Sequence, residues 1–148
     1  MKIFKVSEVR TPERAHSTDS WIDFFVPEGV SLIIMPKSSI TFPLGVKVII
    51  PNWMDLVFHN RSSIASKHWV ILWACVVDNG YTWEIVLNLI NTSWREFRIN
   101  WGDKIVQWIL RKVELNEVEE VDLLWFETEV AKKEKWRGEG KLGSTNKK

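Results

Sequence analysis

Short runs of apolar residues, or of alternating apolar and polar residues, recur along most of the chain. Such runs predict β-strands, because successive side chains of a strand point to opposite faces of a sheet. Pro, Gly, Asn and Ser separate the runs and favour turns. We expect strands at 2–6, 21–26, 31–35, 43–50, 54–59, 69–78, 81–91, 96–100 and 104–115. This spacing is typical of a β-sandwich or barrel, and no segment has a long helical period.

Residues 76–85 read VVDNGYTWEI and predict a hairpin. Asn-Gly between apolar runs is a strong hairpin signal, because both residues tolerate the positive φ of a two-residue type I′ turn. With Asn79 and Gly80 in the turn, Asp78 and Tyr81 face each other across the strands, with side chains on one face. Two interpretations of Asp78 stay open: a turn former, or a carboxylate beside an aromatic ring in a site.

Two stretches have residue types that suit the binding of anions. SSIASKH (62–68) predicts a helical turn with Ser62 or Ser63 as N-cap, and within RSSIASK (61–67) this turn would leave N–H groups available beside Arg61. Plain helix capping is the alternative. RGEGKLGST (137–145) combines glycines, hydroxyl groups and a guanidinium group, and the alternative is a basic terminus without a site.

Gln107 is a third candidate for ligand binding. Strand alternation in KIVQWIL places it on one face with Ile105 and Ile109. An amide on an apolar face needs a hydrogen-bond partner, which either the protein or a ligand supplies.

Composition narrows the class of protein. The chain has 148 residues, 45% of them hydrophobic and 26% charged, which fits a single domain with a core. A net charge of +1 gives no argument for nucleic acid or a membrane as partner, and we expect neither a membrane span nor a signal peptide. Cys75 is the only cysteine, which favours a reducing compartment. His16, His59 and His68 are scattered and do not have the spacing of a metal site.

Five stretches together resemble, in order, the motifs of the trimeric dUTPase family. They are AHSTDSWID (15–23), RSSIASK (61–67), VVDNGYTWEI (76–85), GDKIVQ (102–107) and RGEGKLGST (137–145). The resemblance covers nearly the whole chain. It implies an all-β jelly roll that forms a homotrimer with active sites shared between subunits. It also implies a β-domain at 1–132 and a flexible, Gly-rich arm at 133–148 that closes over a neighbouring site.

The activity implied by the resemblance is hydrolysis of dUTP to dUMP and pyrophosphate, by attack of water at the α-phosphate. Mg²⁺ would sit on the triphosphate and meet the protein through water, with no direct metal ligand. The location would be the cytoplasm, or the host cytoplasm for a viral enzyme.

By match to the motifs, Asp78 would activate the water, and Tyr81 would pack under the deoxyribose. Arg137 would act on the phosphates as a second catalytic group. The further candidates for substrate contact are Arg61, Ser62, Ser63 and Gln107 for phosphate, Leu72 and Val77 for uracil, and Leu142, Gly143, Ser144 and Thr145 in the arm. Asp23 and Asp103 match motif positions with a mainly structural role.

The sequence departs from the family pattern at several positions. Leu142 stands where the arm usually has an aromatic residue, and Leu72 aligns with an Asn that often reads uracil. Trp21 and Trp83 align with glycines, and further tryptophans, Trp53, Trp69, Trp73 and Trp94, stand near turns or in tight strands. A glycine position with positive φ would be strained by tryptophan. Either the fold has adapted and the indoles fill core and interface, or the sequence was engineered or recoded at glycines.

Three alternatives to a dUTP diphosphatase stay open. The first is a dCTP deaminase of the same superfamily, which also carries an RSS-type motif. The second is a non-catalytic dUTPase-like protein that binds nucleotide or a partner and regulates. The third is a purely structural β-trimer.

Overall fold

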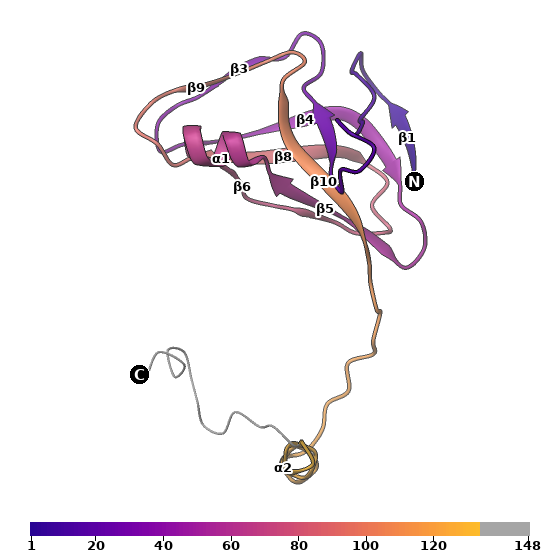
Figure 1. The fold of residues 1–148 in the computed structure, drawn as a ribbon. Helices are drawn as coiled ribbons and strands as arrows, with labels where there is room; N and C mark the ends of the chain where they lie inside the picture. Colours follow the sequence, from indigo (N-terminus) through magenta and orange to yellow (C-terminus); the bar gives the residue numbers. More distant parts are fainter. Residues whose placement is uncertain (134–148) are drawn as a thin grey trace. The chain divides into compact units, whose positions relative to one another are not determined.

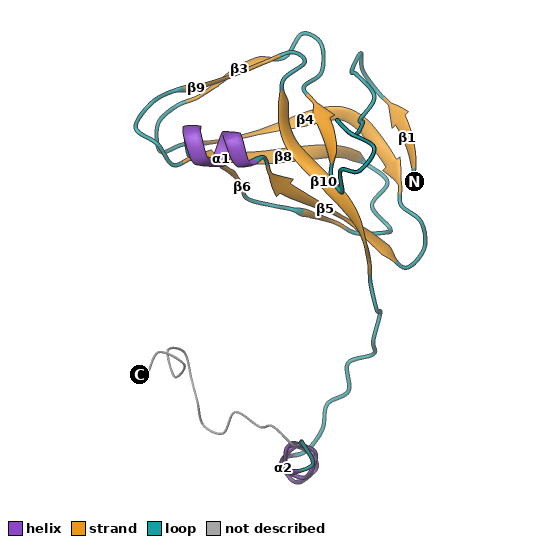
Figure 2. Cartoon of the chain, viewed as in Figure 1, coloured by secondary structure: helices purple, strands orange, loops and turns teal. Residues whose placement is uncertain are grey.

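Within residues 1–133, which the computed structural model describes, the chain forms ten β-strands and two helices (Figures 1 and 2). The elements are β1 (Lys2–Lys5), β2 (Ile22–Phe25), β3 (Ser31–Ile34), β4 (Ser39–Ile49), β5 (Met54–Asn60), α1 (Ser62–His68), β6 (Val70–Leu72), β7 (Val76–Val77), β8 (Glu84–Asn91), β9 (Phe97–Asn100), β10 (Lys104–Lys112) and α2 (Leu123–Ala131). Residues 1–115 form one compact unit, and the second unit, from Asn116 onward, contains α2. The predicted boundary at 132/133 stays a prediction.

Two four-stranded antiparallel sheets make up most of the first unit. Their strand orders are β1-β4-β8-β6 and β2-β10-β5-β7, and β3 pairs with β9 in a separate two-stranded ribbon (Figure 1). The all-β prediction is confirmed, because every pairing in these sheets is antiparallel and the strands lie close to the predicted ranges. None of the described helices is long and apolar enough to cross a membrane.

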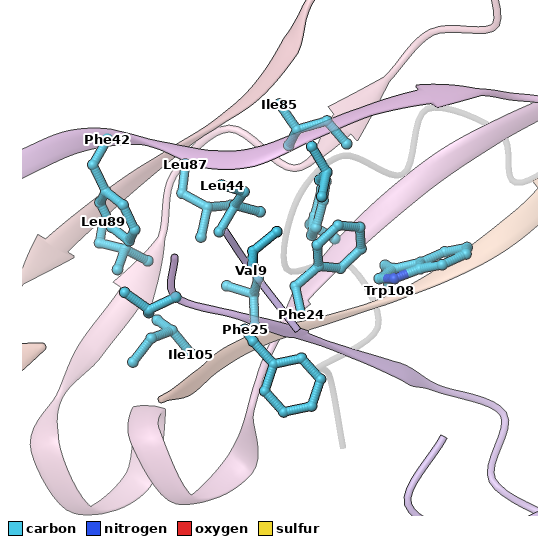
Figure 3. Packing of buried hydrophobic residues seen from close by; sticks show 14 of the residues in the cluster. Val9, Phe24, Phe25, Phe42, Leu44, Ile85, Leu87, Leu89, Ile105 and Trp108 are labelled. Carbon is cyan, nitrogen blue, oxygen red and sulfur yellow. The ribbon is translucent and has the colours of Figure 1, made fainter. Parts of the chain in front are cut away.

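The core lies where the inner faces of the strands meet (Figure 3). In β8, Ile85, Leu87 and Leu89 are almost fully buried at alternate positions, which is the period of a half-buried strand. Asn91 continues this alternation and is also buried. Its amide group is hydrogen-bonded there, because Nδ2 donates to the carbonyl oxygens of Ile34, at 2.9 Å, and Arg95, at 2.7 Å.

The predicted hairpin is wrong in its pairing. β6 pairs with β8, whereas β7 pairs with β5 in the other sheet, so Asp78 and Tyr81 are not opposite each other across a strand ladder. The N–H of Phe58 donates to the Cys75 carbonyl oxygen at 2.6 Å and holds the chain against β5. The segment 69–78, predicted as one strand, therefore forms β6 in one sheet and β7 in the other.

The Asn-Gly turn forms, but it is not of type I′. The N–H of Tyr81 donates to the carbonyl oxygen of Asp78 at 3.0 Å, which closes a four-residue turn. In residues 1–133, Asn79 and Gly80 are not among the residues with positive φ, which a type I′ turn needs at both central positions. Since the flanking arms belong to different sheets, the turn need not match the twist of a hairpin.

α1 forms over the predicted range 62–68, but its cap and the presence of a second helix differ from the sequence prediction. The N-cap of α1 is Arg61, not Ser62 or Ser63, and no side chain caps the helix there. α2 was not predicted, although its start has an ordinary signal: Asp122 is the N-cap and accepts a hydrogen bond from the Trp125 N–H at 2.7 Å.

Candidate functional site

A charged cluster joins β2, β10 and the start of α1. Asp23 of β2 is buried, with Lys104 Nζ 2.9 Å from Oδ2 and Arg61 Nε 3.4 Å from Oδ1. Arg61 Nη1 also donates to the Lys104 carbonyl oxygen at 2.7 Å. Asp23 thus has a structural role, and it fixes the guanidinium group of Arg61 immediately before α1. These contacts use Nε and Nη1, and the fork of five N–H donors has others to offer an anion.

Ser62 and Ser63 follow Arg61 as the first residues of α1, and both are exposed. Because neither side chain caps the helix, their hydroxyl groups are available to a ligand. Arg61, Ser62 and Ser63 are thus adjacent at the start of α1, as predicted, but the N-cap is Arg61 and not a serine.

Alternation from Ile105 predicted that Gln107 lies on the apolar face of the strand. The structure places it on the other face. The register between β10 and β2 shifts between Lys104 and Val106, and this irregularity changes the faces that follow. Val106 and Trp108 are therefore buried, while Gln107 is partly exposed on the opposite face.

Asn60, which sequence reasoning missed, connects two of the predicted residues. Its carbonyl oxygen accepts a hydrogen bond from Gln107 Nε2 at 3.4 Å, and its Oδ1 accepts one from the Leu72 N–H at 2.6 Å. Asn60 directly precedes Arg61, so Arg61, Leu72 and Gln107 belong to one group. The only sequence signal was a polar amide at the end of strand β5.

Asp78 lies at the other end of β5. Val77 pairs with Leu56, which places the exposed Asp78 beside the Met54–Asp55 start of that strand. A hollow of about 430 Å³ has Asp78 in its wall, together with Asn52, Trp53, Met54, Asp55, Asn79, Gly80, Val113 and Leu115. Asn79 Nδ2 donates to the Pro51 carbonyl oxygen at 2.6 Å and holds the turn in place.

Tyr81 has its hydroxyl group engaged close to its own position. The O–H donates to the Glu84 carbonyl oxygen at 2.8 Å, and the ring meets Trp83 edge to face, with centroids 5.5 Å apart. The aromatic face that the resemblance assigns to the sugar is thus oriented by a backbone contact. Its partner in that contact, Glu84, is three residues further along the chain at the start of β8, not across a hairpin.

An ion pair near Asp78 was not predicted. Arg111 Nη2 lies 2.5 Å from Asp55 Oδ2, and Arg111 Nε donates to Oδ1 at 3.3 Å. The hydrogen bond and the charge of Asp55 raise the pKa of Arg111 above its ordinary value. Asp55 is buried, so Asp78 is the accessible carboxylate of this hollow.

The predicted residues therefore form two groups within one chain. One group surrounds Asn60 at the end of β5, and the other surrounds Asp78 near its start. Asn60 is five positions after Asp55 in β5, which corresponds to about 17 Å along a strand. Within one chain, Arg61 and Asp78 therefore lie near opposite ends of β5.

Comparison with known proteins decides the family. The family model described as dUTPase matches residues 7–135. The chain belongs to the dUTPase family. The family predicted from the sequence is thereby confirmed.

Named dUTPase relatives extend over most of the chain. The deoxyuridine 5'-triphosphate nucleotidohydrolase of Kluyveromyces lactis is 40% identical over 147 residues, covering 95% of this chain and 89% of the relative. The protein of the same name from Gloeothece citriformis is 34% identical over 148 residues, covering 98% of this chain and 95% of the relative.

Solved dUTPase structures have the same fold. The dUTPase of Staphylococcus bacteriophage 80alpha with dUpNHpp matches with a TM-score of 0.82 and 21% identity, over 97% of this chain and 96% of that one. A mutant dUTPase from phage phi11 of S. aureus, reported with a structural Mg(II) ion, has a TM-score of 0.76 and 23% identity, over 82% of this chain and 95% of that one.

The dUTPase motifs now have places in the structure. The first ends in β2 at Asp23, the second covers the start of α1, the third spans β7 and the turn after Asp78, and the fourth opens β10. The fifth lies outside the described residues, as do its candidates Arg137, Leu142, Gly143, Ser144 and Thr145. In residues 1–133, no three His, Cys, Asp or Glu side chains gather as they would to hold a metal ion.

Proposed function

We propose that this chain is a dUTP diphosphatase, which hydrolyses dUTP to dUMP and pyrophosphate by attack of water at the α-phosphate. One observation carries the proposal: a chain that belongs to the dUTPase family over residues 7–135 has an exposed Asp78 in the wall of a hollow. A carboxylate that a water molecule and a phosphate can both reach is suited to act as a general base.

Phosphate binding is assigned to the group around Asn60 and to the arm. Arg61 is oriented by Asp23, the exposed Ser62 and Ser63 follow it, and Gln107 is on the same side through Asn60. Charge-assisted hydrogen bonds from a guanidinium group suit a triphosphate. By match to the fifth motif we add Arg137, Gly143, Ser144 and Thr145.

Uracil recognition is assigned to the segment between β6 and β7. Residues 73–75 belong to neither strand and are exposed. The Trp73 N–H donates to the Asn88 carbonyl oxygen, and the Cys75 carbonyl oxygen accepts from the Phe58 N–H. The backbone groups of Ala74 between them are therefore the ones offered to the edge of a base. Leu72 and Val77 flank this segment. The Leu72 N–H already donates to Asn60, so the side chain of Leu72 is its contact with the base. Leu142 of the arm would cover the base without an aromatic ring, and Tyr81 would pack on the deoxyribose.

We also propose that the active form is a homotrimer with sites shared between chains. The support comes from the two groups of site residues, which lie at opposite ends of β5 in one chain. Asp78 of one chain would meet the Arg61 group of a neighbour, and the arm of residues 133–148 would close over a site of a neighbouring chain.

Mg²⁺ is the proposed cofactor, held on the triphosphate. The residues present fit this arrangement, because Mg²⁺ commonly keeps several waters and binds substrate phosphates with few protein ligands. The buried Asp23 is occupied by Arg61 and Lys104, which leaves it unsuited to a metal. When bound, the ion neutralises charge on the phosphates, while Asp78 orients and deprotonates the water.

The test is pyrophosphate release with Mg²⁺ from dUTP, dTTP, dCTP and UTP. We expect release from dUTP alone, and a fall of about 10²–10⁴-fold in the Asp78→Asn variant. Glu96→Gln, which removes a carboxylate from an exposed ion pair with Arg98, is the matched control and should keep full activity. Ammonia release from dCTP would instead support a deaminase. Nucleotide binding without release would support a regulatory protein.

A further inference from the structure

Trp53 and Trp69 have backbone conformations that suit glycine. Their φ angles are +61° and +57°, and Lys37 is the only other non-glycine residue with positive φ in residues 1–133. For a bulky L side chain this left-handed region is an outlier, because Cβ crowds the backbone, whereas glycine enters it freely. Two of the three non-glycine residues with positive φ are therefore tryptophans, which needs a physical explanation.

The surrounding backbone fixes these conformations. Trp69 ends α1, where its N–H donates to the Ala65 carbonyl oxygen at 3.1 Å, and a left-handed residue at this place in a helix is usually glycine. The Trp69 carbonyl oxygen also accepts from the Thr92 N–H at 2.9 Å. Trp53 is in the turn between β4 and β5, and its carbonyl oxygen accepts from the Val113 N–H at 2.9 Å.

Within one chain, the two indoles bring no compensating burial. Trp53 and Trp69 are 66% and 64% exposed, whereas Trp108 is 2% exposed in the core. The side chain of Trp53 also lines the hollow that contains Asp78. Both positions thus carry backbone strain with little packing gain from the side chain.

We infer that the protein made in its own cell has glycine at positions 53 and 69, because a codon read here as tryptophan is translated there as glycine. UGA is a stop codon in the standard code, but variant codes read it as tryptophan or as glycine, whereas UGG is tryptophan in all of them. A different reading of UGA would therefore replace some tryptophans by glycine and leave those encoded by UGG unchanged. The composition agrees, with ten tryptophans and seven glycines in 148 residues. This inference does not depend on the proposed hydrolysis of dUTP.

Peptide mass spectrometry of the protein purified from its own cell tests the inference directly. Tryptic peptide 48–61 contains position 53, and peptide 68–95 contains position 69. We expect fragment ions to show glycine at both. Peptide 105–111 is the internal control, since the buried Trp108 should remain tryptophan. Tryptophan at 53 or 69 in the natural protein overturns the inference.

A second measurement tests the physical basis with the chain as written here. Trp53→Gly and Trp69→Gly should each raise Tm by about 2–6 °C, because they release left-handed strain. Trp94→Gly is the matched control: Trp94 is 81% exposed but does not have positive φ, so its Tm should not rise. An unchanged or lower Tm in both test variants contradicts the argument. Neither measurement uses dUTP, so their outcome is separate from that of the proposed activity.

Discussion

Arg61, the residue directly before α1, lies with its Nε 3.4 Å from the buried carboxylate of Asp23 in β2. The first and second dUTPase motifs, almost forty residues apart in the chain, therefore meet in one ion pair. Lys104 of the fourth motif completes it from β10, with Nζ 2.9 Å from Asp23. Three motifs are thus connected through one buried carboxylate.

Asp23→Asn should lower both stability and substrate affinity. The amide keeps the shape of the side chain but loses the charge that Arg61 and Lys104 face, so we expect a loss of about 1–3 kcal/mol in the free energy of unfolding. KM for dUTP should rise, because Arg61 is no longer held in place. Urea denaturation and steady-state kinetics measure the two effects. Unchanged stability would mean that the cluster is not the anchor of Arg61.

Gln107 and Trp108 are neighbours in β10 with opposite roles. Gln107→Ala should change the free energy of unfolding by less than about 0.5 kcal/mol, because Gln107 is on the outer face. It should lower kcat/KM for dUTP about tenfold through the loss of a hydrogen bond. Trp108→Ala should cost about 3–5 kcal/mol, because it empties a core position. A large stability loss in Gln107→Ala would place the side chain in the core after all.

The positions of the strands were predictable because they depend on local alternation. The faces of β10 were not, because the irregularity between Lys104 and Val106 comes from pairing with β2, which local sequence does not encode. The partner of β7 was missed for the same reason: the bond from Phe58 to Cys75 is long-range, whereas Asn-Gly favours a hairpin locally. Among the site residues, motif resemblance identified Arg61 and Asp78, but it had no means to show Asn60 between Leu72 and Gln107.

A chain that ends at residue 133 should fold and yet hydrolyse dUTP poorly. All buried hydrophobic side chains of the described residues lie between Val9 and Trp108, so the core does not depend on the arm. Loss of Arg137 and the hydroxyl groups of the fifth motif should reduce kcat by about 10²-fold, as removal of a charge-stabilising donor does. Thermal unfolding and kinetics of the truncated chain test both parts. Failure to fold would assign the arm a structural role.

Restoration of activity by mixing two inactive variants would test whether the sites are shared. Asp78→Asn removes the base, Arg61→Ala removes a phosphate contact, and the two positions lie at opposite ends of β5 in one chain. If Asp78 of one chain serves a neighbour's Arg61, co-expression of the two variants leaves some sites with both residues intact. Random assembly from equal amounts predicts recovery at about a quarter of the sites.

The control for this mixing experiment is co-expression of Asp78→Asn with the double variant Asp78→Asn/Arg61→Ala. Every chain then lacks the base, so activity should stay at the level of Asp78→Asn alone. Different affinity tags on the two chains allow mixed assemblies to be isolated before dUTP hydrolysis is measured. Recovery in the first mixture but not in the control requires Asp78 and Arg61 from different chains, since neither variant has both residues. No recovery in isolated mixed assemblies would place the complete site within one chain, against the separation along β5.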